Sequence, residues 1–336
     1  MTLKFALAGA GYIAEIHARA IQHHPQAELS TVVEKFPEKA AAFAQKHKLL
    51  RQYATVDEMI AAGGIDALVI GTPNFLHAPQ AVAALEAGIH VMVEKPMAMN
   101  TAEALDMQAA AQKSGAQLMV AHCWRFDEEV LWLKERANQV GQIIRTKGYG
   151  VHANWGPAGW FTQKALAGGG ALADMGIHAI DTVRFLLGDP QPISVYAKIG
   201  TYYGDFDVDD TGVIIINWEN GVTSYIESGW WQPHMDGPEA ATQLYGKKGF
   251  GQIFPTRLEI PDPVNEKLDV IEGGFPFPRA EHCPQGMYDR QMASFVEGIL
   301  ANKTPIPGAA EGLINMRILE AAYQSAKSDQ VVEISS

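Results

Sequence analysis

Two kinds of hydrophobic pattern alternate over the first 121 residues. Short apolar runs of strand length are separated by alanine-rich runs with helical spacing. The apolar runs show little polar alternation, as expected of strands that are buried on both faces. Such alternation predicts parallel strands joined by helical crossovers, and hence a doubly wound sheet. The predicted strands are Leu3–Ala8, Leu29–Val33, Ala67–Ile70, His90–Val93 and Gln117–Ala121, and the predicted helices are Ile13–Ile21, Glu38–His47, Pro79–Ala87 and Thr101–Ser114.

The hydrophobic pattern changes from residue 122 onward. A helical run is followed by longer alternating runs, and Glu219–Gly221 is a strong signal for a hairpin turn. We therefore expect an α+β domain over residues 122–336 with a large, open, mostly antiparallel sheet. Its predicted strands are Ile143–Ala153, Ile193–Tyr203, Gly212–Trp218 and Thr223–Trp231, and its predicted helices are Glu128–Gln139, Ala171–Leu187, Tyr288–Ala301 and Ala309–Ser328. The Pro- and Gly-rich stretch Pro255–Pro284 is expected to be an irregular loop with room for one strand.

A glycine motif joins the first predicted strand to the first predicted helix. Gly9, Gly11 and Ala14 have the spacing G-x-G-x-x-A. In a doubly wound fold the first glycine makes the turn, the second leaves room for a pyrophosphate, and the third small residue lets the helix pack on the strand. The helix N-terminus then points free N–H groups at the phosphates. Residues 1–121 are therefore predicted to form a dinucleotide-binding Rossmann domain.

An acidic residue ends the second predicted strand. Glu34 lies 23 residues after Gly11, close to the offset of roughly 20 expected of a carboxylate that binds the adenosine ribose. A carboxylate there accepts hydrogen bonds from the ribose hydroxyls and repels a 2′-phosphate, which favours NAD. Lys35 stands beside it and could bind a 2′-phosphate, so NADP remains the alternative cofactor. An ordinary strand-end carboxylate is the structural alternative for Glu34.

The composition of the chain limits which partners, compartment and metal sites can be expected. The net charge of −12 and the absence of a basic stripe argue against a nucleic-acid partner. No apolar run approaches the roughly 20 residues needed to span a bilayer. The two cysteines, Cys123 and Cys283, fit a reducing compartment, and no leader pattern is visible, so we expect a cytoplasmic protein. His282 and Cys283 lack further ligands at metal spacing, so no metal site is expected.

The predicted antiparallel sheet has runs that are too apolar to face water. These include Val213–Ile216 and Trp230–Trp231. A protein partner that covers the open face, most simply a second copy of the chain, is therefore expected. Loops of the same chain are the alternative cover.

Three groups of residues could carry chemistry. Glu94–Lys95–Pro96 follows the fourth predicted strand, where open α/β sheets bind their ligands. Gly71–Asn74, with His77, follows the third predicted strand. The glycine run Gly168–Gly170 precedes Asp174 and His178 in the second domain.

Together these motifs resemble the Gfo/Idh/MocA family of NAD(P)-dependent oxidoreductases. The resemblance rests on Gly9, Gly11 and Ala14, on Thr72–Asn74, on Glu94–Pro96, on Trp124–Phe126 and on Asp174–Asp181. It implies a Rossmann domain followed by a domain with a large open sheet, and assembly through that sheet into a homodimer or homotetramer. It also implies hydride transfer between NAD(P) and a secondary alcohol or ketone of a sugar or cyclic polyol, with Lys95, Asp174 and His178 as the catalytic residues.

The same three residues suit this chemistry. Oxidation of a secondary alcohol needs a base for the hydroxyl proton, and His178, with an unperturbed pKa of about 6.5, can provide it. In a helix Asp174 and His178 would share one face and Asp174 could orient the imidazole or a hydroxyl. Lys95 would stabilise the developing alkoxide. The structural alternatives are a surface lysine at a strand end and a self-satisfying Asp–His pair.

The remaining site residues are predicted as two sets. The cofactor set is Gly9, Gly11, Tyr12, Ile13, Glu34, Lys35, Thr72, Pro73, Asn74, His77, Glu94 and Lys95. The substrate set is His122, Arg125, Asn154, Trp155 and Trp160. The two tryptophans lie in a Gly-rich loop where flat rings suit a sugar face, with core packing as their alternative. An NAD-dependent glycosidase that oxidises and then eliminates, and a non-catalytic dinucleotide-binding regulator, are the alternative functions.

Overall fold

The computed structural model of the chain describes residues 2–232, 239–281 and 283–334. Two compact units divide it: unit 1 takes residues from 1–123 and 284–316, and unit 2 takes residues from 124–283 and 317–336. The sequence placed everything after residue 121 in the second domain. Residues 284–316 group with unit 1 instead, because helix α9 (Gln285–Leu300) packs on α1 (Tyr12–His23). Phe295 of α9 also meets Phe5 edge-on, with ring centroids 6.2 Å apart.

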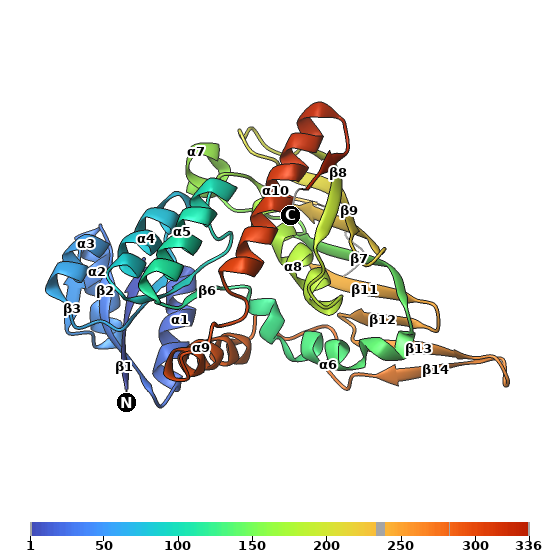
Figure 1. Cartoon of the computed structure of the whole chain (residues 1–336), viewed down its shortest axis with the longest axis horizontal. Helices are drawn as coiled ribbons and strands as arrows, with labels where there is room; N and C mark the ends of the chain where they lie inside the picture. The colour runs from blue at the N-terminus through green and yellow to red at the C-terminus, as the bar shows by residue number, and fades with distance from the viewer. Residues whose placement is uncertain (1, 233–238, 282, 335–336) are drawn as a thin grey trace. The chain divides into compact units, whose positions relative to one another are not determined.

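Unit 1 is built on a six-stranded parallel sheet. The strand order is β3 (Arg51–Tyr53), β2 (Ala27–Val33), β1 (Leu3–Ala8), β4 (Ala67–Ile70), β5 (His90–Val93) and β6 (Leu118–Val120). Its other helices are α2 (Pro37–His47), α3 (Val56–Ala62), α4 (His77–Glu86) and α5 (Thr101–Ser114), with short 3₁₀ turns at Asn74–Leu76 and Cys123–Phe126. Figure 1 shows α4 and α5 side by side. The order reverses direction at β1 and β4, which confirms the predicted doubly wound fold.

One strand of this sheet and one helix of unit 1 were not predicted from the sequence. Strand β3 has three residues, none fully buried, and helix α3 has seven, so neither gives a clear apolar period. Thr55 caps α3 by accepting a hydrogen bond from the Glu58 amide. The runs Ala67–Ile70 and His90–Val93, predicted as the third and fourth strands, are therefore β4 and β5.

Unit 2 holds a nine-stranded mixed sheet. Its order is β14 (Lys267–Glu272), β13 (Arg257–Asp262), β12 (Phe250–Ile253), β11 (Ala240–Gly246), β7 (Ile143–Val151), β10 (Thr223–Gly229), β9 (Thr211–Trp218), β8 (Pro192–Gly200) and β15 (Val332–Glu333). Only β7 and β10 run parallel among these described strands, so the mostly antiparallel sheet is confirmed. The helical segments are α6 (Glu128–Arg136), α7 (Lys164–Ala167), a π-helical segment (Leu172–Gly176), α8 (Ile177–Leu186), the end of α10 (Ala309–Ser328) and 3₁₀ turns at Ala137–Val140 and Gly159–Thr162.

The predicted loop Pro255–Pro284 is wrong in its first half, because it contains the β13–β14 hairpin. All residues of β14 are exposed, so this strand has no buried face and no apolar alternation to reveal it. The predicted hairpin at Glu219–Gly221 is confirmed, since β9 and β10 pair in antiparallel register on either side of it. Gly221 takes the left-handed conformation there, with φ of +80°.

One face of the unit 2 sheet packs on helix α8 and the π-helical segment. The apolar run of β9 alternates within the unit: Ile214 and Ile216 are fully buried, whereas Ile215 is 39% exposed. Tyr225 on the neighbouring strand β10 pairs with Ile215 and is 37% exposed. Half of this run therefore lies on the opposite face of the sheet, where α8 does not cover it.

Two features of the described residues bear on the expected partners. None of their helices combines the length and the apolar character that crossing a bilayer requires. They also hold no group of three or more His, Cys, Asp or Glu side chains arranged to bind a metal ion. His282, considered above with Cys283, lies outside the described residues.

Candidate functional site

The glycine motif forms a tight turn at the carboxyl end of β1. Gly9 has φ of +96°, and a Cβ atom there would lie 2.8 Å from the carbonyl oxygen of Gly71, so glycine is needed twice over. A Cβ atom on Gly11 would meet nothing within 4 Å. Tyr12 is 80% exposed and no side chain caps the start of α1. The turn thus keeps open room beside a helix N-terminus, which fits a dinucleotide pyrophosphate. Ile13, also in the predicted cofactor set, packs on the other side, near Gly71.

Glu34 reaches back to the glycine turn. Its Oε2 accepts a hydrogen bond from the Ala10 amide at 3.1 Å, and its Oε1 accepts one from the Phe36 amide at 3.0 Å. The carboxylate is therefore fixed beside the turn, where the sequence places the adenosine ribose. Lys35 points its ammonium over the Phe36 ring, 5.0 Å from the centroid.

The segment after β4 is tied to the segment after β5. Buried His77 places Nε2 2.9 Å from the Thr72 carbonyl oxygen and Nδ1 2.9 Å from the Pro96 carbonyl oxygen. Burial lowers the pKa of His77, against the effect of these carbonyls. A neutral ring donates to one carbonyl at a time. Pro73 and Asn74 follow in the same segment, and Asn74 is buried.

A buried His–Glu pair lies directly before Lys95. The Nε2 of His17 on α1 is 2.7 Å from Oε1 of Glu94, and Oε2 of Glu94 accepts a hydrogen bond from the Lys95 amide at 3.2 Å. Burial raises the pKa of Glu94, but the hydrogen bond and charge of His17, together with Lys95, bring it below its ordinary value. A buried carboxylate therefore stays charged beside the candidate catalytic lysine.

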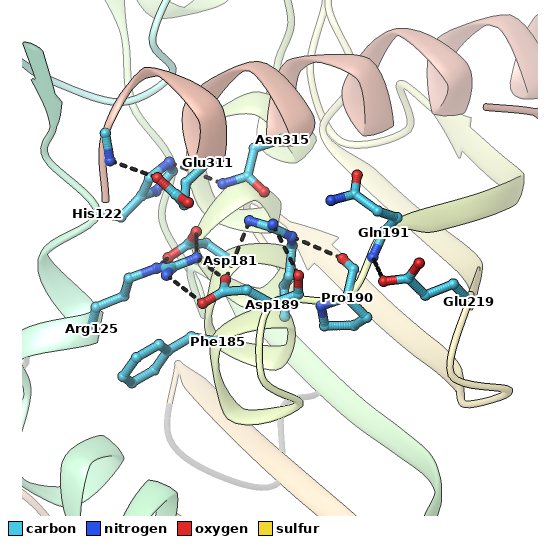
Figure 2. A network of polar contacts seen from close by, with 12 residues as sticks. His122, Arg125, Asp181, Phe185, Asp189, Pro190, Gln191, Glu219, Glu311 and Asn315 are labelled. Atoms are coloured by element: carbon cyan, nitrogen blue, oxygen red, sulfur yellow. Dashed lines mark hydrogen bonds and ion pairs between the residues drawn. The ribbon is translucent and has the colours of Figure 1, made fainter. Parts of the chain in front are cut away.

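His122 and Arg125, both predicted to bind substrate, belong to different units. In unit 1 the side-chain amide of Asn315 is hydrogen-bonded to Nε2 of buried His122, with Nδ2 and Nε2 3.0 Å apart. Figure 2 shows both side chains. Asn315 therefore holds the His122 ring in place, and this neighbour was not predicted from the sequence.

In unit 2 Arg125 is the centre of a buried ion network (Figure 2). Its Nε and Nη2 donate to the two carboxylate oxygens of Asp181 at 2.8 Å each, and Nη1 and Nη2 donate to Asp189 at 3.1 and 2.7 Å. Burial alone would lower the pKa of Arg125, but the two carboxylates raise it well above its ordinary value. Every guanidinium nitrogen is engaged, so the observed role of Arg125 is to join the segment after β6 to α8.

Asp174 and His178 lie at a change of helical winding. Asp174 is in the π-helical segment and His178 is in the first turn of α8, so the expected straight helix is replaced by one with a wider turn. The Nε1 of Trp230 donates to Oδ2 of Asp174 at 3.1 Å. The buried His178 ring stacks on Trp124, with centroids 5.6 Å apart and planes 29° apart. Aromatic side chains thus fix both proposed catalytic groups of unit 2.

The loop after β7 carries the other predicted substrate residues. Asn154 has φ of +60°, and Trp155 stacks on His152 with ring centroids 3.6 Å apart. Glu239 accepts the indole N–H of Trp155 at 2.7 Å. Trp160 stacks on its neighbour in the chain, Phe161, at 3.8 Å. Trp155 is 47% exposed, so part of its surface is accessible to a ligand.

The sequence missed several residues that hold the predicted ones in place. His17, Trp230 and Asn315 act across long separations in the chain, and no local period points to a partner. A weak signal existed for His17, since a polar residue stands on the buried face of the predicted helix Ile13–Ile21.

Family models match both parts of the chain. Residues 3–122 match the oxidoreductase family with an NAD-binding Rossmann fold, and residues 136–250 match the GFO/IDH/MocA C-terminal domain. The chain belongs to the Gfo/Idh/MocA oxidoreductase family. As a member of that family it is an NAD(P)-dependent oxidoreductase, as predicted, and the room beside Gly11 fits such a cofactor.

Named relatives span nearly the same length. The chain is 29% identical to D-glucoside 3-dehydrogenase of Escherichia coli, covering 99% of this chain and 97% of the relative. It is 31% identical to an oxidoreductase subunit of Amycolatopsis mediterranei, covering 79% of each. Among solved structures, an aldose-aldose oxidoreductase from Caulobacter crescentus, complexed with glycerol, superimposes with a TM-score of 0.85 at 28% identity, over 99% of this chain and 100% of that one.

Proposed function

We propose that this oxidoreductase transfers a hydride between NAD and a secondary alcohol or ketone of a sugar or cyclic polyol. The observation that carries the proposal is the position of Lys95, two residues after the end of β5 at the carboxyl edge of an NAD-binding sheet. Relatives named as a glucoside dehydrogenase and an aldose-aldose oxidoreductase support the substrate class.

The chain's own residues have distinct roles in this proposal. The Lys95 ammonium lowers the pKa of the substrate hydroxyl and stabilises the alkoxide as it forms. The His178 imidazole takes the hydroxyl proton, and Asp174 orients a substrate hydroxyl or that imidazole. The cofactor supplies the hydride acceptor. Glu94, charged and buried, directly precedes Lys95 in the chain, and the charge of Lys95 lowers the pKa of Glu94.

The test follows the absorbance of reduced nicotinamide while the protein is incubated with NAD and a panel of myo-inositol, methyl β-D-glucopyranoside and D-glucose. We expect turnover with at least one compound, and a fall in kcat of about 100-fold or more in Lys95→Met and in His178→Asn. Lys113→Met and His23→Asn are matched controls at exposed positions and should keep full activity. Full activity in both site variants would contradict the assigned roles.

A glycosidase that oxidises and then eliminates is distinguished in the same assay. p-Nitrophenyl β-D-glucopyranoside would release nitrophenol without net formation of reduced cofactor. Accumulation of reduced cofactor with methyl β-D-glucopyranoside, in step with oxidised sugar, is the result we expect from a dehydrogenase.

We infer that NAD is preferred over NADP. The Glu34 carboxylate accepts one hydrogen bond from the Ala10 amide of the glycine turn and one from the nearby Phe36 amide, so it cannot easily swing away from a 2′-phosphate. The ratio of kcat/KM for NAD and NADP measures the preference, and Glu34→Gln should shift that ratio toward NADP by removing the negative charge. A wild-type protein that favours NADP would show that Lys35 outweighs Glu34.

We infer that the open face of the unit 2 sheet binds a second copy of the chain. It presents Ile215 and Tyr225 at more than a third exposure, beside Lys147, whose ammonium lies 5.6 Å from the Tyr225 ring centroid. Light scattering after gel filtration should give a dimer or tetramer mass. Ile215→Asp should release monomers, whereas Leu50→Asp, at a 91% exposed position in unit 1, should not. A wild-type monomer would contradict the inference.

A further inference from the structure

The glycines that precede Asp174 are constrained by close contacts with other residues and not only by the turn that they make. A Cβ atom on Gly169 would lie 2.1 Å from the hydroxyl oxygen of Tyr323, and one on Gly170 would lie 1.8 Å from the carbonyl oxygen of Asp209. Both glycines are therefore needed because Asp209 and Tyr323 approach the backbone closely. Tyr323 is on α10, and Asp209 lies two residues before the start of β9.

Asp209 receives three successive amide groups at the start of the π-helical segment. Its Oδ1 accepts from Gly170 and its Oδ2 from Leu172, at 2.8 Å each. Its own carbonyl oxygen accepts from the Ala171 amide, also at 2.8 Å. The first amides of a helix lack partners within it and are usually capped by a neighbour in sequence. Here the cap comes from a residue 37 to 39 positions away.

Tyr323 completes this cap. Its hydroxyl donates to Oδ1 of Asp209 at 2.8 Å, and both residues belong to unit 2. Burial raises the pKa of Tyr323 well above its ordinary value, and Asp209 raises it further, so the hydroxyl remains a donor at every working pH. Burial also raises the pKa of Asp209, against the hydrogen bonds that it accepts. Each donor therefore helps to keep a buried carboxylate in place.

Packing connects the cap to Asp174. Ala171 and Met175 of the helical segment form one buried cluster with Val208 and Trp230. The Trp230 indole then donates to the Asp174 carboxylate at 3.1 Å. The segment is thus held by hydrogen bonds at its first amides, by apolar contacts along its length and by an indole on its acidic side chain.

We propose that Asp209 and Tyr323 are positioning residues that fix the π-helical segment, and through it set the placement of Asp174 and His178 for catalysis. The inference rests on the proposed function, because it needs Asp174 and His178 to act on a substrate. Neither Asp209 nor Tyr323 is assigned contact with the substrate or the cofactor. A shift of about 1 Å in a catalytic group costs on the order of 100-fold in rate, so a small loosening of the segment would be visible in kcat.

The test uses Tyr323→Phe in the full-length protein, with Tyr196→Phe as a matched control. Tyr196 also donates its hydroxyl to an aspartate, Asp329, at 2.8 Å, but on the surface. With the most active panel compound we expect kcat to fall about 10-fold or more in Tyr323→Phe, with KM for NAD within about twofold of wild type. A deuterium isotope effect on kcat, measured with substrate labelled at the oxidised carbon, should rise because hydride transfer becomes slower. Tyr196→Phe should match wild type in all three measurements.

A second measurement separates positioning from general loss of stability. Hydrogen exchange of peptides that span residues 170–176 should speed up in Tyr323→Phe, while peptides from β1 and β5 of unit 1 keep their wild-type protection. Faster exchange at 170–176 with an unchanged kcat overturns the positioning role, and so does unchanged exchange with an unchanged kcat. A wild type that turns over no panel compound overturns the proposed function and this inference together, whereas an active wild type with an equally active Tyr323→Phe overturns this inference alone.

Discussion

The buried pair of His17 and Glu94 allows a prediction with a definite sign. Replacing His17 with leucine keeps an apolar side chain in the space of the imidazole but removes the 2.7 Å hydrogen bond. Of the groups named above that lower its pKa, Glu94 then keeps only the amide and the charge of Lys95. The side chains are 1% and 11% exposed, so water cannot replace the lost contact. A lost hydrogen bond to a buried charge costs about 2–4 kcal/mol of unfolding free energy at neutral pH.

The pH dependence distinguishes this loss from simple repacking. In the wild type the pKa of Glu94 is below its ordinary value, so its stabilising contribution is present above the unfolded pKa and is lost only as acid protonates the folded protein. In His17→Leu only the amide and the charge of Lys95 oppose the effect of burial, which raises that pKa. The folded variant then binds a proton that the unfolded chain does not, so its deficit should shrink as pH falls from about 8 to about 5. The deficit shrinks by about 1.4 kcal/mol for each pH unit over which that difference holds.

Urea unfolding measures both effects. All seven tryptophans of the chain lie between Trp124 and Trp231, in unit 2, so fluorescence follows unit 2 while far-UV circular dichroism follows both units. His47→Leu is the matched control, because His47 binds Glu15 at 2.9 Å and that carboxylate is 25% exposed and keeps Lys46. The control should cost less than about 1 kcal/mol. A loss below 1 kcal/mol in His17→Leu, or a deficit that stays constant over the pH range, would refute the reasoning.

Two further substitutions test the packing of unit 2. Arg125→Lys keeps the charge but cannot donate to two carboxylates at once. Unfolding monitored by tryptophan fluorescence should therefore show a loss of about 2–4 kcal/mol in unfolding free energy. A loss under about 0.5 kcal/mol would contradict the buried network. Gly170→Ala puts a methyl group against the Asp209 carbonyl and should lower the melting temperature or prevent folding, whereas Gly286→Ala, whose Cβ would have its nearest neighbour at 3.6 Å, should melt like wild type. Equal melting of the two variants would show that the Asp209 contact gives way.

The parallel sheet could be predicted from the sequence because its strands are buried on both faces. Strands β1, β4 and β5 have the predicted bounds, since each is a continuous apolar run between turn signals. Strand β3 and the β13–β14 hairpin were missed for the opposite reason. Their residues are largely exposed, and their place in a sheet comes from pairing with neighbours that the local pattern does not reveal.

Some contacts of the candidate site could likewise be predicted from the sequence, and others could not. Gly9 and Glu34 could be predicted because a motif fixes their spacing and their contacts are close to the turn itself. The bonds of His17 to Glu94 and of Trp230 to Asp174 could not be predicted, since they join residues 77 and 56 positions apart. Arg125 shows the limit of a motif, because its type and position were clear while its two carboxylate partners were not.

These long-range hydrogen bonds have one physical effect in common. Lys95 lies just past the end of a strand, and Asp174 lies in a π-helical segment, so the regular hydrogen bonding of a sheet or α-helix does not fix either residue. In both cases a buried carboxylate from the same unit accepts backbone amides beside the proposed catalytic residue: Glu94 accepts the Lys95 amide, and Asp209 accepts amides at the start of the π-helical segment. A buried charge that must keep its donors resists local motion, because each lost donor leaves an unsatisfied carboxylate in an apolar interior. Proposed catalytic groups at irregular backbone positions therefore gain fixed geometry from partners that themselves do no chemistry.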